Sequence, residues 1–165
     1  MSPFTQFLLL SLAIGVGATA VMDVWLGFLK SRGVATLNFA FIGRWVGHAL
    51  RGRVAHMAIA QATAVRGELA LGWLMHYATG VVFAAALLAV AGLDWARQPT
   101  PLPALAMGVA TVAVPLLLIQ PAMGAGVLAR RTPTPLRNCL RSLVNHAVFG
   151  LGLYLAALSL AWLSR

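Results

Sequence analysis

Hydrophobic and polar positions divide the chain into four long apolar stretches separated by segments rich in arginine. A helix needs roughly 20 apolar residues to cross the hydrocarbon core of a bilayer. The pattern therefore predicts an all-α integral membrane protein with four transmembrane helices in a bundle. We expect a single membrane domain over residues 1–165 with spans at about 4–29, 69–93, 104–123 and 142–163.

The segment after the first apolar stretch predicts a different kind of helix. Its apolar residues recur at helical spacing and lie among several arginines, as Phe39, Ile42, Trp45, Val46 and Ala49 show. A helix of this kind lies along the lipid headgroups, with its basic side chains toward anionic lipid. We therefore expect an interfacial amphipathic helix here.

The third apolar stretch contains an internal proline, Pro115, and ends in the motif QPAMGAG at 120–126. Proline removes one backbone donor from a helix and bends it, so we expect a kink. The glycine-containing motif is not a phosphate-binding loop, because it has no following Lys-Ser or Lys-Thr and no preceding strand.

Charge is distributed unevenly along the chain, which carries 12 Lys and Arg against 3 Asp and Glu. The formal net charge of +9 would suit nucleic acid, but the basic residues lie between apolar stretches and no nucleic-acid-binding motif is present. The positive-inside bias explains them better. It predicts that the basic loops 30–68 and 124–141 are cytoplasmic and that both termini lie on the opposite side. The one cysteine, Cys139, falls in the second basic loop, so no intramolecular disulfide is possible.

Glycines flank a histidine in the second apolar stretch. Gly72, His76 and Gly80 recur every four residues, so they share one face of a helix. Glycine lets a second helix approach closely in lipid, which would place this imidazole against protein rather than acyl chains. His146 and Gly150 repeat the spacing in the fourth stretch. The echo is compatible with a duplicated hairpin and equally with chance.

Polar side chains occur at similar predicted depth in all four stretches. Ionisable groups inside a span are costly and mark functional sites by default. We expect a cytoplasm-facing polar pocket whose candidate residues are Asp23, Glu68, His76, Gln120 and His146, with Arg44 and His48 at its mouth. A structural hydrogen-bond network that fixes helix register explains the same residues. Asp23, His76 and His146 are also candidate metal ligands of N,N,O type, or a set of groups that relays protons.

Sequence motifs assign no enzyme activity to the chain. No Gly-x-Ser-x-Gly elbow, His-Glu-x-x-His motif or cysteine nucleophile context is present. His48 and His56 stand eight residues apart without a cysteine nearby, a poor metal-binding pattern, and are interpreted as interfacial histidines with ordinary roles.

Five segments together resemble a known family. They are GATAVMDVW (17–25), LNFAFIGRWVGH (37–48), LGWLMHYATGVVFAAAL (71–87), QPAMGAGVLARRTP (120–133) and RSLVNHAVFGLGLYL (141–155). They resemble the bacterial membrane proteins grouped as DUF2938, a family of unknown function. The resemblance implies a small four-span protein of the inner membrane, which would make both termini periplasmic. It implies no substrate, cofactor or catalytic residue.

Three hypotheses for function remain open. The first is a small permease-like or ion- or proton-handling protein, which predicts a homodimer or larger assembly because four spans are few for a monomeric pathway. The second is a membrane-embedded metal protein or enzyme with a divalent metal as cofactor. The third is a structural or accessory subunit that docks a larger membrane complex through its glycine faces.

Overall fold

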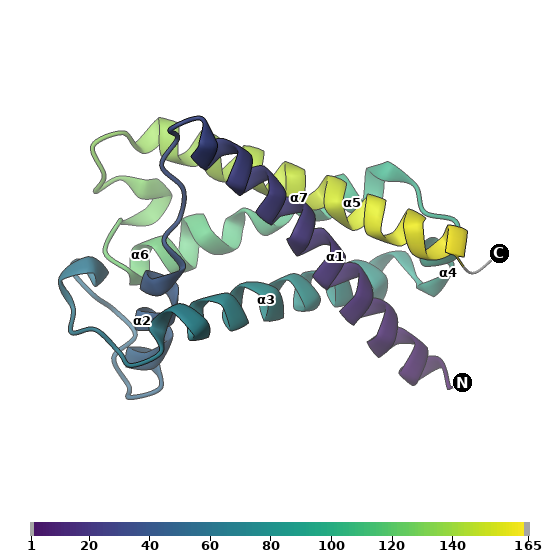
Figure 1. The fold of residues 1–165 in the computed structure, drawn as a ribbon, viewed down its shortest axis with the longest axis horizontal. Helices are drawn as coiled ribbons and strands as arrows, with labels where there is room; N and C mark the ends of the chain where they lie inside the picture. The colour runs from purple at the N-terminus through teal and green to yellow at the C-terminus, as the bar shows by residue number, and fades with distance from the viewer. Residues whose placement is uncertain (1, 164–165) are drawn as a thin grey trace. The chain divides into compact units, whose positions relative to one another are not determined.

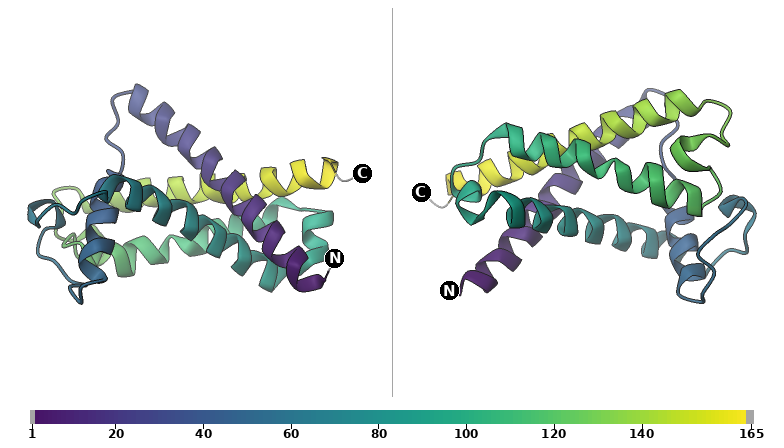
Figure 2. Two further views of the ribbon diagram at one scale, coloured as in Figure 1. Left: turned by 60° about the horizontal axis from the view of Figure 1, so that its bottom comes forward. Right: turned by 180° about the vertical axis from the view of Figure 1, so that it is seen from behind.

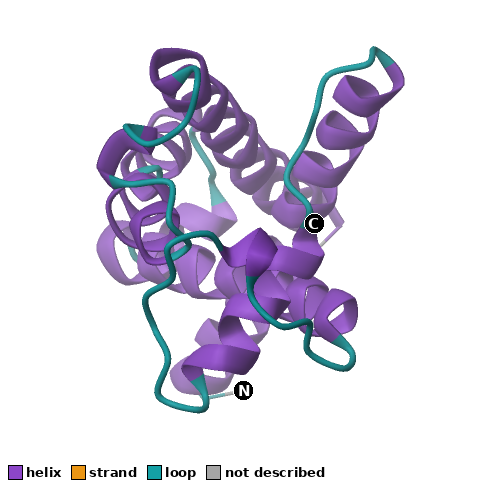
Figure 3. Cartoon of the chain, turned by 90° about the vertical axis from the view of Figure 1, so that its left-hand side faces the viewer, coloured by secondary structure: helices purple, strands orange, loops and turns teal. Residues whose placement is uncertain are grey.

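The computed structural model describes residues 2–163, which fold into helices and loops with no β-strand among them (Figure 3). Four helices are long and apolar enough to cross a membrane: Pro3–Ser31, Glu68–Ala91, Pro101–Ala122 and Pro135–Leu163. The predicted all-α fold with four such helices is therefore confirmed. Helices of this composition suit a lipid environment, because each satisfies its own backbone hydrogen bonds.

Figure 1 shows the helices in chain order. Their bounds are α1 Pro3–Ser31, α2 Phe39–Ala49, α3 Glu68–Ala91, α4 Leu93–Arg97, α5 Pro101–Thr111, a π-helical stretch Pro115–Ile119, α6 Gln120–Ala122 and α7 Pro135–Leu163. Short 3-10 turns lie at Ile59–Gln61 and Val127–Ala129.

The described chain divides into two compact units. The first unit consists of residues 2–35, 77–111 and 145–163, and the second of residues 36–76 and 112–144. Helices α3 and α7 each contribute residues to both units.

Small residues bring the helices of the first unit into close contact. Within it, α1 crosses α3 and α7, as Figures 1 and 2 show. A Cβ placed on Gly15 would lie 2.5 Å from the Cα of Val81, and one on Gly152 would lie 2.8 Å from the carbonyl oxygen of Ala18. Helices in lipid gain little from hydrophobicity and associate through such packing. Gly80, one of the glycines on the predicted face, takes part in this contact, because a Cβ on it would lie 3.1 Å from the carbonyl oxygen of Gly15.

The second unit is built around a crossing of α2 and the start of α3. A Cβ on Gly43 would collide with the carbonyl oxygen of Glu68, and one on Gly72 would collide with the carbonyl oxygen of Phe39. The two backbones are therefore in direct contact. A helix does follow the first span as predicted, and one of its faces is buried against protein.

Two helix boundaries differ from the hydropathy pattern. Helix α7 begins at Pro135, seven residues before the predicted span at 142, so Arg137, Cys139 and Arg141 lie on its first turns rather than in a loop. Hydropathy marks only the apolar part of a helix, whereas the backbone hydrogen bonds continue into the polar part. The regular helix α5 ends at Thr111 and a π-helical stretch begins at Pro115, where an irregularity is expected.

The backbone contact at Gly72 leads to a stability prediction. Gly72→Ala is expected to lower the free energy of unfolding by about 1–3 kcal/mol, because the added methyl group must push α2 away from α3. Unfolding of the detergent-solubilised protein by added SDS measures the change.

Gly27→Ala is the matched control. No atom lies within 4 Å of a Cβ at Gly27, and alanine is the better helix former, so this variant should be at least as stable as the wild type. Equal stability of the two variants would contradict the close crossing.

Candidate functional site

An ion pair joins α2 to the start of α3 in the second unit. The Arg44 guanidinium donates two hydrogen bonds to the Glu68 carboxylate, from Nε to Oε2 and from Nη2 to Oε1, each of 2.8 Å. The side chains are only 12% and 17% exposed. Paired bonds of this kind are among the strongest that side chains make. The hydrogen bond to Glu68 raises the pKa of Arg44 above its ordinary value.

The same two side chains also hold loop backbone. Arg44 Nη1 donates to the carbonyl oxygens of Ala60 and Ala62, both at 3.1 Å, and Glu68 Oε2 accepts a bond from the Val65 backbone N–H at 3.0 Å. The pair therefore fixes the loop that precedes α3. Of the candidate pocket residues, these two are in direct contact.

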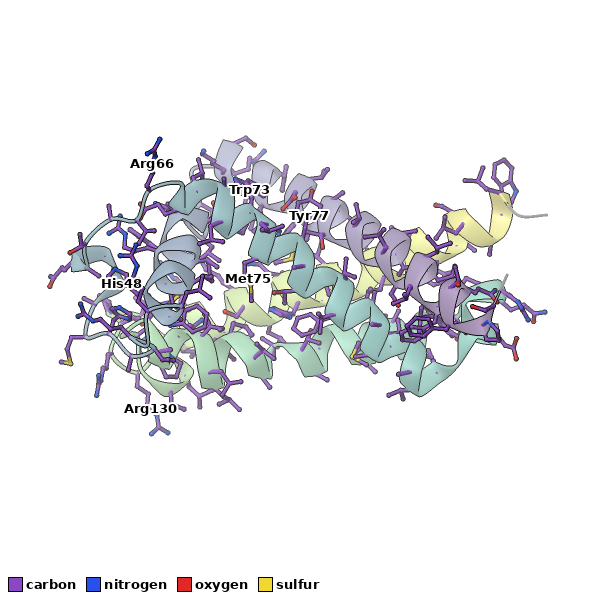
Figure 4. All side chains as sticks on the ribbon, turned by 90° about the horizontal axis from the view of Figure 1, so that it is seen from below. His48, Arg66, Trp73, Met75, Tyr77 and Arg130 are labelled. Carbon is purple, nitrogen blue, oxygen red and sulfur yellow. The ribbon has the colours of Figure 1, made fainter. Side chains whose placement is uncertain are left out.

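Two histidines lie side by side in the second unit. The rings of His48, which lies on α2 and is labelled in Figure 4, and of His56 are 5.0 Å apart between centroids and inclined at 72°. His48 Nε2 is 2.9 Å from the carbonyl oxygen of Thr63. Burial lowers the pKa of His56, and the nearby His48 and Arg53 lower it further.

His76 packs among aromatic rings of the second unit. Its ring centroid is 4.5 Å from that of Phe39 and 5.8 Å from that of Trp73. Contact with α2 through Phe39 places the imidazole against protein, as its glycine-lined face predicts.

Asp23 lies in α1 of the first unit and is bonded to a residue of α3. The Tyr77 hydroxyl donates to Asp23 Oδ2 at 2.8 Å, and Figure 4 shows Tyr77 on α3. Two residues further along α1, the Trp25 indole N–H donates to Asn145 Oδ1 of α7 at 3.0 Å. Polar bonds thus link α1 to both neighbouring helices.

His146 is the second ionisable candidate in the first unit. Its Nδ1 is 3.0 Å from Thr111 Oγ1, and that hydroxyl donates its own proton to the Gly108 carbonyl oxygen at 2.7 Å. The hydroxyl oxygen must therefore accept from the imidazole, which places the ring proton on Nδ1. The other nitrogen, Nε2, is left with the lone pair of a base.

Gln120 has one satisfied and one unsatisfied end. Its Nε2 donates to Ser142 Oγ at 3.4 Å, whereas Oε1 is buried and has no hydrogen-bond partner within residues 2–163. A buried polar atom of this kind costs free energy unless a further group binds it.

The structure distributes the candidate residues over both units. Asp23 and His146 belong to the first, while His76, Gln120 and the Arg44–Glu68 pair belong to the second with His48. In the part of the chain that the structure describes, no group of three or more His, Cys, Asp or Glu side chains is arranged to hold a metal ion. The shared polar pocket stays a prediction.

Sequence reasoning missed several partners of these residues. Tyr77 bonds to Asp23 and Thr111 to His146, and only helix packing brings these partners together. His56 was assigned an ordinary role. The sequence signal for its contact with His48 is Gly52, which lies between the two histidines. In the structure Gly52 has a φ of +80° and the chain reverses there.

One family model matches the chain. The family is described as protein of unknown function (DUF2938), and the match covers residues 12–160, so the resemblance seen in the sequence is confirmed. No curated protein and no solved structure matches.

The Arg44–Glu68 pair leads to a second stability prediction. Arg44→Ala should lower the unfolding midpoint much more than Arg66→Ala, because it leaves the Glu68 carboxylate half-buried without its partner, whereas Arg66 is exposed. Arg44→Lys should be intermediate, since lysine keeps the charge but not the paired geometry. Thermal unfolding in detergent measures all three.

The double variant Arg44→Ala/Glu68→Ala separates pairing from packing. Removing both charges should cost less than the sum of the two single changes. Strict additivity would mean that the two groups do not stabilise each other.

Proposed function

The chain belongs to the DUF2938 family, whose function is unknown, and from its partly buried polar contacts we propose that it handles protons or small ions in a membrane as a permease-like protein. The observation that carries the proposal is the hydrogen bond of 2.8 Å between Tyr77 and Asp23, within helices apolar enough to span a bilayer. A carboxyl group at such a position is costly to keep and is retained where function needs it.

The chemistry of the pair suits proton exchange. A carboxyl group gains and releases a proton far more readily than a phenol, so Asp23 is the group that changes charge. The Tyr77 hydroxyl can donate to the carboxylate, and its oxygen can accept a bond in turn. His146, whose Nε2 carries a free lone pair, is a second proton-exchanging group of the same unit. These groups support movement of protons or of small cations coupled to them.

The proposal includes an orientation. The loops 30–68 and 124–141 carry six and four of the 12 basic residues, so we place them in the cytoplasm and both termini in the periplasm of a bacterial inner membrane. Anionic headgroups are the partners we assign to these arginines. Because four helices are few for a pathway through one chain, we assign a homodimer or larger assembly.

Proton flux into liposomes tests the function. Purified protein is reconstituted with a pH-sensitive dye inside the vesicles, and a potassium gradient with valinomycin drives uptake. Asp23→Asn should reduce flux at least about tenfold, because the amide cannot take up a proton. Tyr77→Phe should reduce it less, since the carboxyl group remains.

Asp94→Asn is the matched control, since Asp94 lies on the short helix α4, is 91% exposed and forms an ion pair with Arg97. It should transport like the wild type. Equal flux in the Asp23 and Asp94 variants would overturn the proposal. An absence of flux in the wild type with protons, sodium and potassium would favour an accessory role instead.

Reporter fusions test the orientation separately. A reporter fused after Asp94 should be active in the periplasm and one fused after Arg131 in the cytoplasm, because basic loops are retained inside. Alkaline phosphatase and green fluorescent protein give opposite readouts on the two sides. The reverse pattern would invert the proposed topology.

A further inference from the structure

Two histidines that are eight residues apart in the sequence come together in the second unit, on segments that are both held in place. His48 lies on α2, and the chain reverses at Gly52 before it reaches His56. Backbone hydrogen bonds from His56 N to Ala122 O at 2.8 Å and from Ile59 N to Met123 O at 3.0 Å tie the returning loop to the end of α6. The 5.0 Å separation of the rings is therefore set by the fold.

The surroundings of His48 define which ring nitrogen carries the proton when the ring is neutral. Its Nε2 lies 2.9 Å from the Thr63 carbonyl oxygen, which can only accept a hydrogen bond. The proton of the neutral ring is therefore on Nε2, and the lone pair is on Nδ1. A carbonyl that fixes one nitrogen while the other carries the lone pair is the usual support of a metal-ligating histidine.

His56 has unused binding capacity. Both of its ring nitrogens are buried, and neither makes a hydrogen bond of good geometry among residues 2–163, although the Ala122 carbonyl oxygen lies close enough to the ring to act against the lowering of its pKa. Buried polar groups in folded proteins nearly always have a partner, so such atoms point to a bound group. The Gln120 side-chain oxygen, two residues before Ala122, is a third buried atom without one. The shortage of partners is thus concentrated where the loop meets α6.

We propose that Nδ1 of His48 and a ring nitrogen of His56 bind a divalent transition-metal ion such as Zn²⁺, Ni²⁺ or Co²⁺. Metal–nitrogen bonds are about 2.0–2.1 Å long, so two imidazoles on one tetrahedral ion have ring centres about 5 Å apart. The observed centroid distance of 5.0 Å agrees with this value. Such bonds are shorter than hydrogen bonds, so an ion needs less room between buried nitrogens than a water molecule does.

The imidazole ligands and the nearby Arg53 favour a transition-metal ion over Mg²⁺ or Ca²⁺. The positive charge of Arg53, which lowers the pKa of His56, opposes any cation at this place, so the bound ion must form coordinate bonds strong enough to offset it. Imidazole nitrogen binds borderline transition metals through strong coordinate bonds and binds Mg²⁺ or Ca²⁺ poorly. Because no third His, Cys, Asp or Glu joins the pair within residues 2–163, the remaining ligands are oxygens of water or of the Gln120 amide. The site is independent of the Asp23–Tyr77 pair.

Titration calorimetry of tag-free protein in detergent, stripped with a chelator, tests the site with Zn²⁺, Ni²⁺ and Co²⁺ in turn. The wild type should bind one equivalent, and His56→Ala and His48→Ala should each bind at least about tenfold more weakly. His56→Ala is the more informative variant, because the His56 ring makes no hydrogen bond of good geometry within residues 2–163, whereas the His48 ring is bonded to the Thr63 carbonyl oxygen.

His76→Ala and His146→Ala are the matched controls, and both should bind metal like the wild type. Metal should also raise the unfolding temperature of the wild type and of both controls but not that of His56→Ala. No saturable binding of any of the three ions would overturn the proposal. Unchanged binding in His56→Ala would do so equally, as would loss of binding confined to the two controls.

Discussion

Contact between helix backbones at glycine is the interaction on which the packing of this protein depends. Lipid gives apolar helices little reason to associate, so shape and close approach must hold them. Gly15 meets Gly80 and Val81 where α1 crosses α3, and Gly43 meets Gly72 where α2 crosses the start of α3. In each case the neighbouring atom is backbone, which cannot move aside as a side chain can. Contact faces of this kind determine which residues of neighbouring helices meet.

Polar contacts add direction to this packing. In the first unit, Asp23 is bonded to Tyr77 and His146 to Thr111, so each of these two ionisable side chains has a neutral hydroxyl partner. In the second unit Arg44 and Glu68 neutralise each other and hold the loop before α3. The hydroxyl-bonded groups Asp23 and His146 can exchange a proton, whereas Arg44 and Glu68 satisfy each other's charge. We therefore assign the proposed function to the first group of polar residues and the stabilisation of the loop to the second.

The place where the loop between α2 and α3 meets α6 also contains the buried polar atoms of the second unit that lack partners in the part of the chain that the structure describes. His48, His56 and Gln120 lie in segments tied together by backbone hydrogen bonds, yet the two His56 nitrogens and the Gln120 oxygen are buried without partners in residues 2–163. Burying nitrogen atoms without hydrogen-bond partners lowers the stability of the folded state, so structure alone does not explain this arrangement. A metal ion bound to the histidine nitrogens would remove this cost. For that reason we propose the metal site here and not in the spans.

The sequence by itself determined the class of the protein and the number and approximate positions of its apolar helices, because hydrophobic length is a local property that the bilayer thickness makes decisive. It also predicted the irregularity at Pro115, because proline lacks the backbone N–H and disturbs the helix at its own position. Tertiary structure alone decided which polar groups meet. That Asp23 bonds to Tyr77, and that His56 returns to His48, depends on helix rotation and loop closure. Periodicity assigns a residue to a face of its helix, but only the packing of one helix against another decides what that face meets.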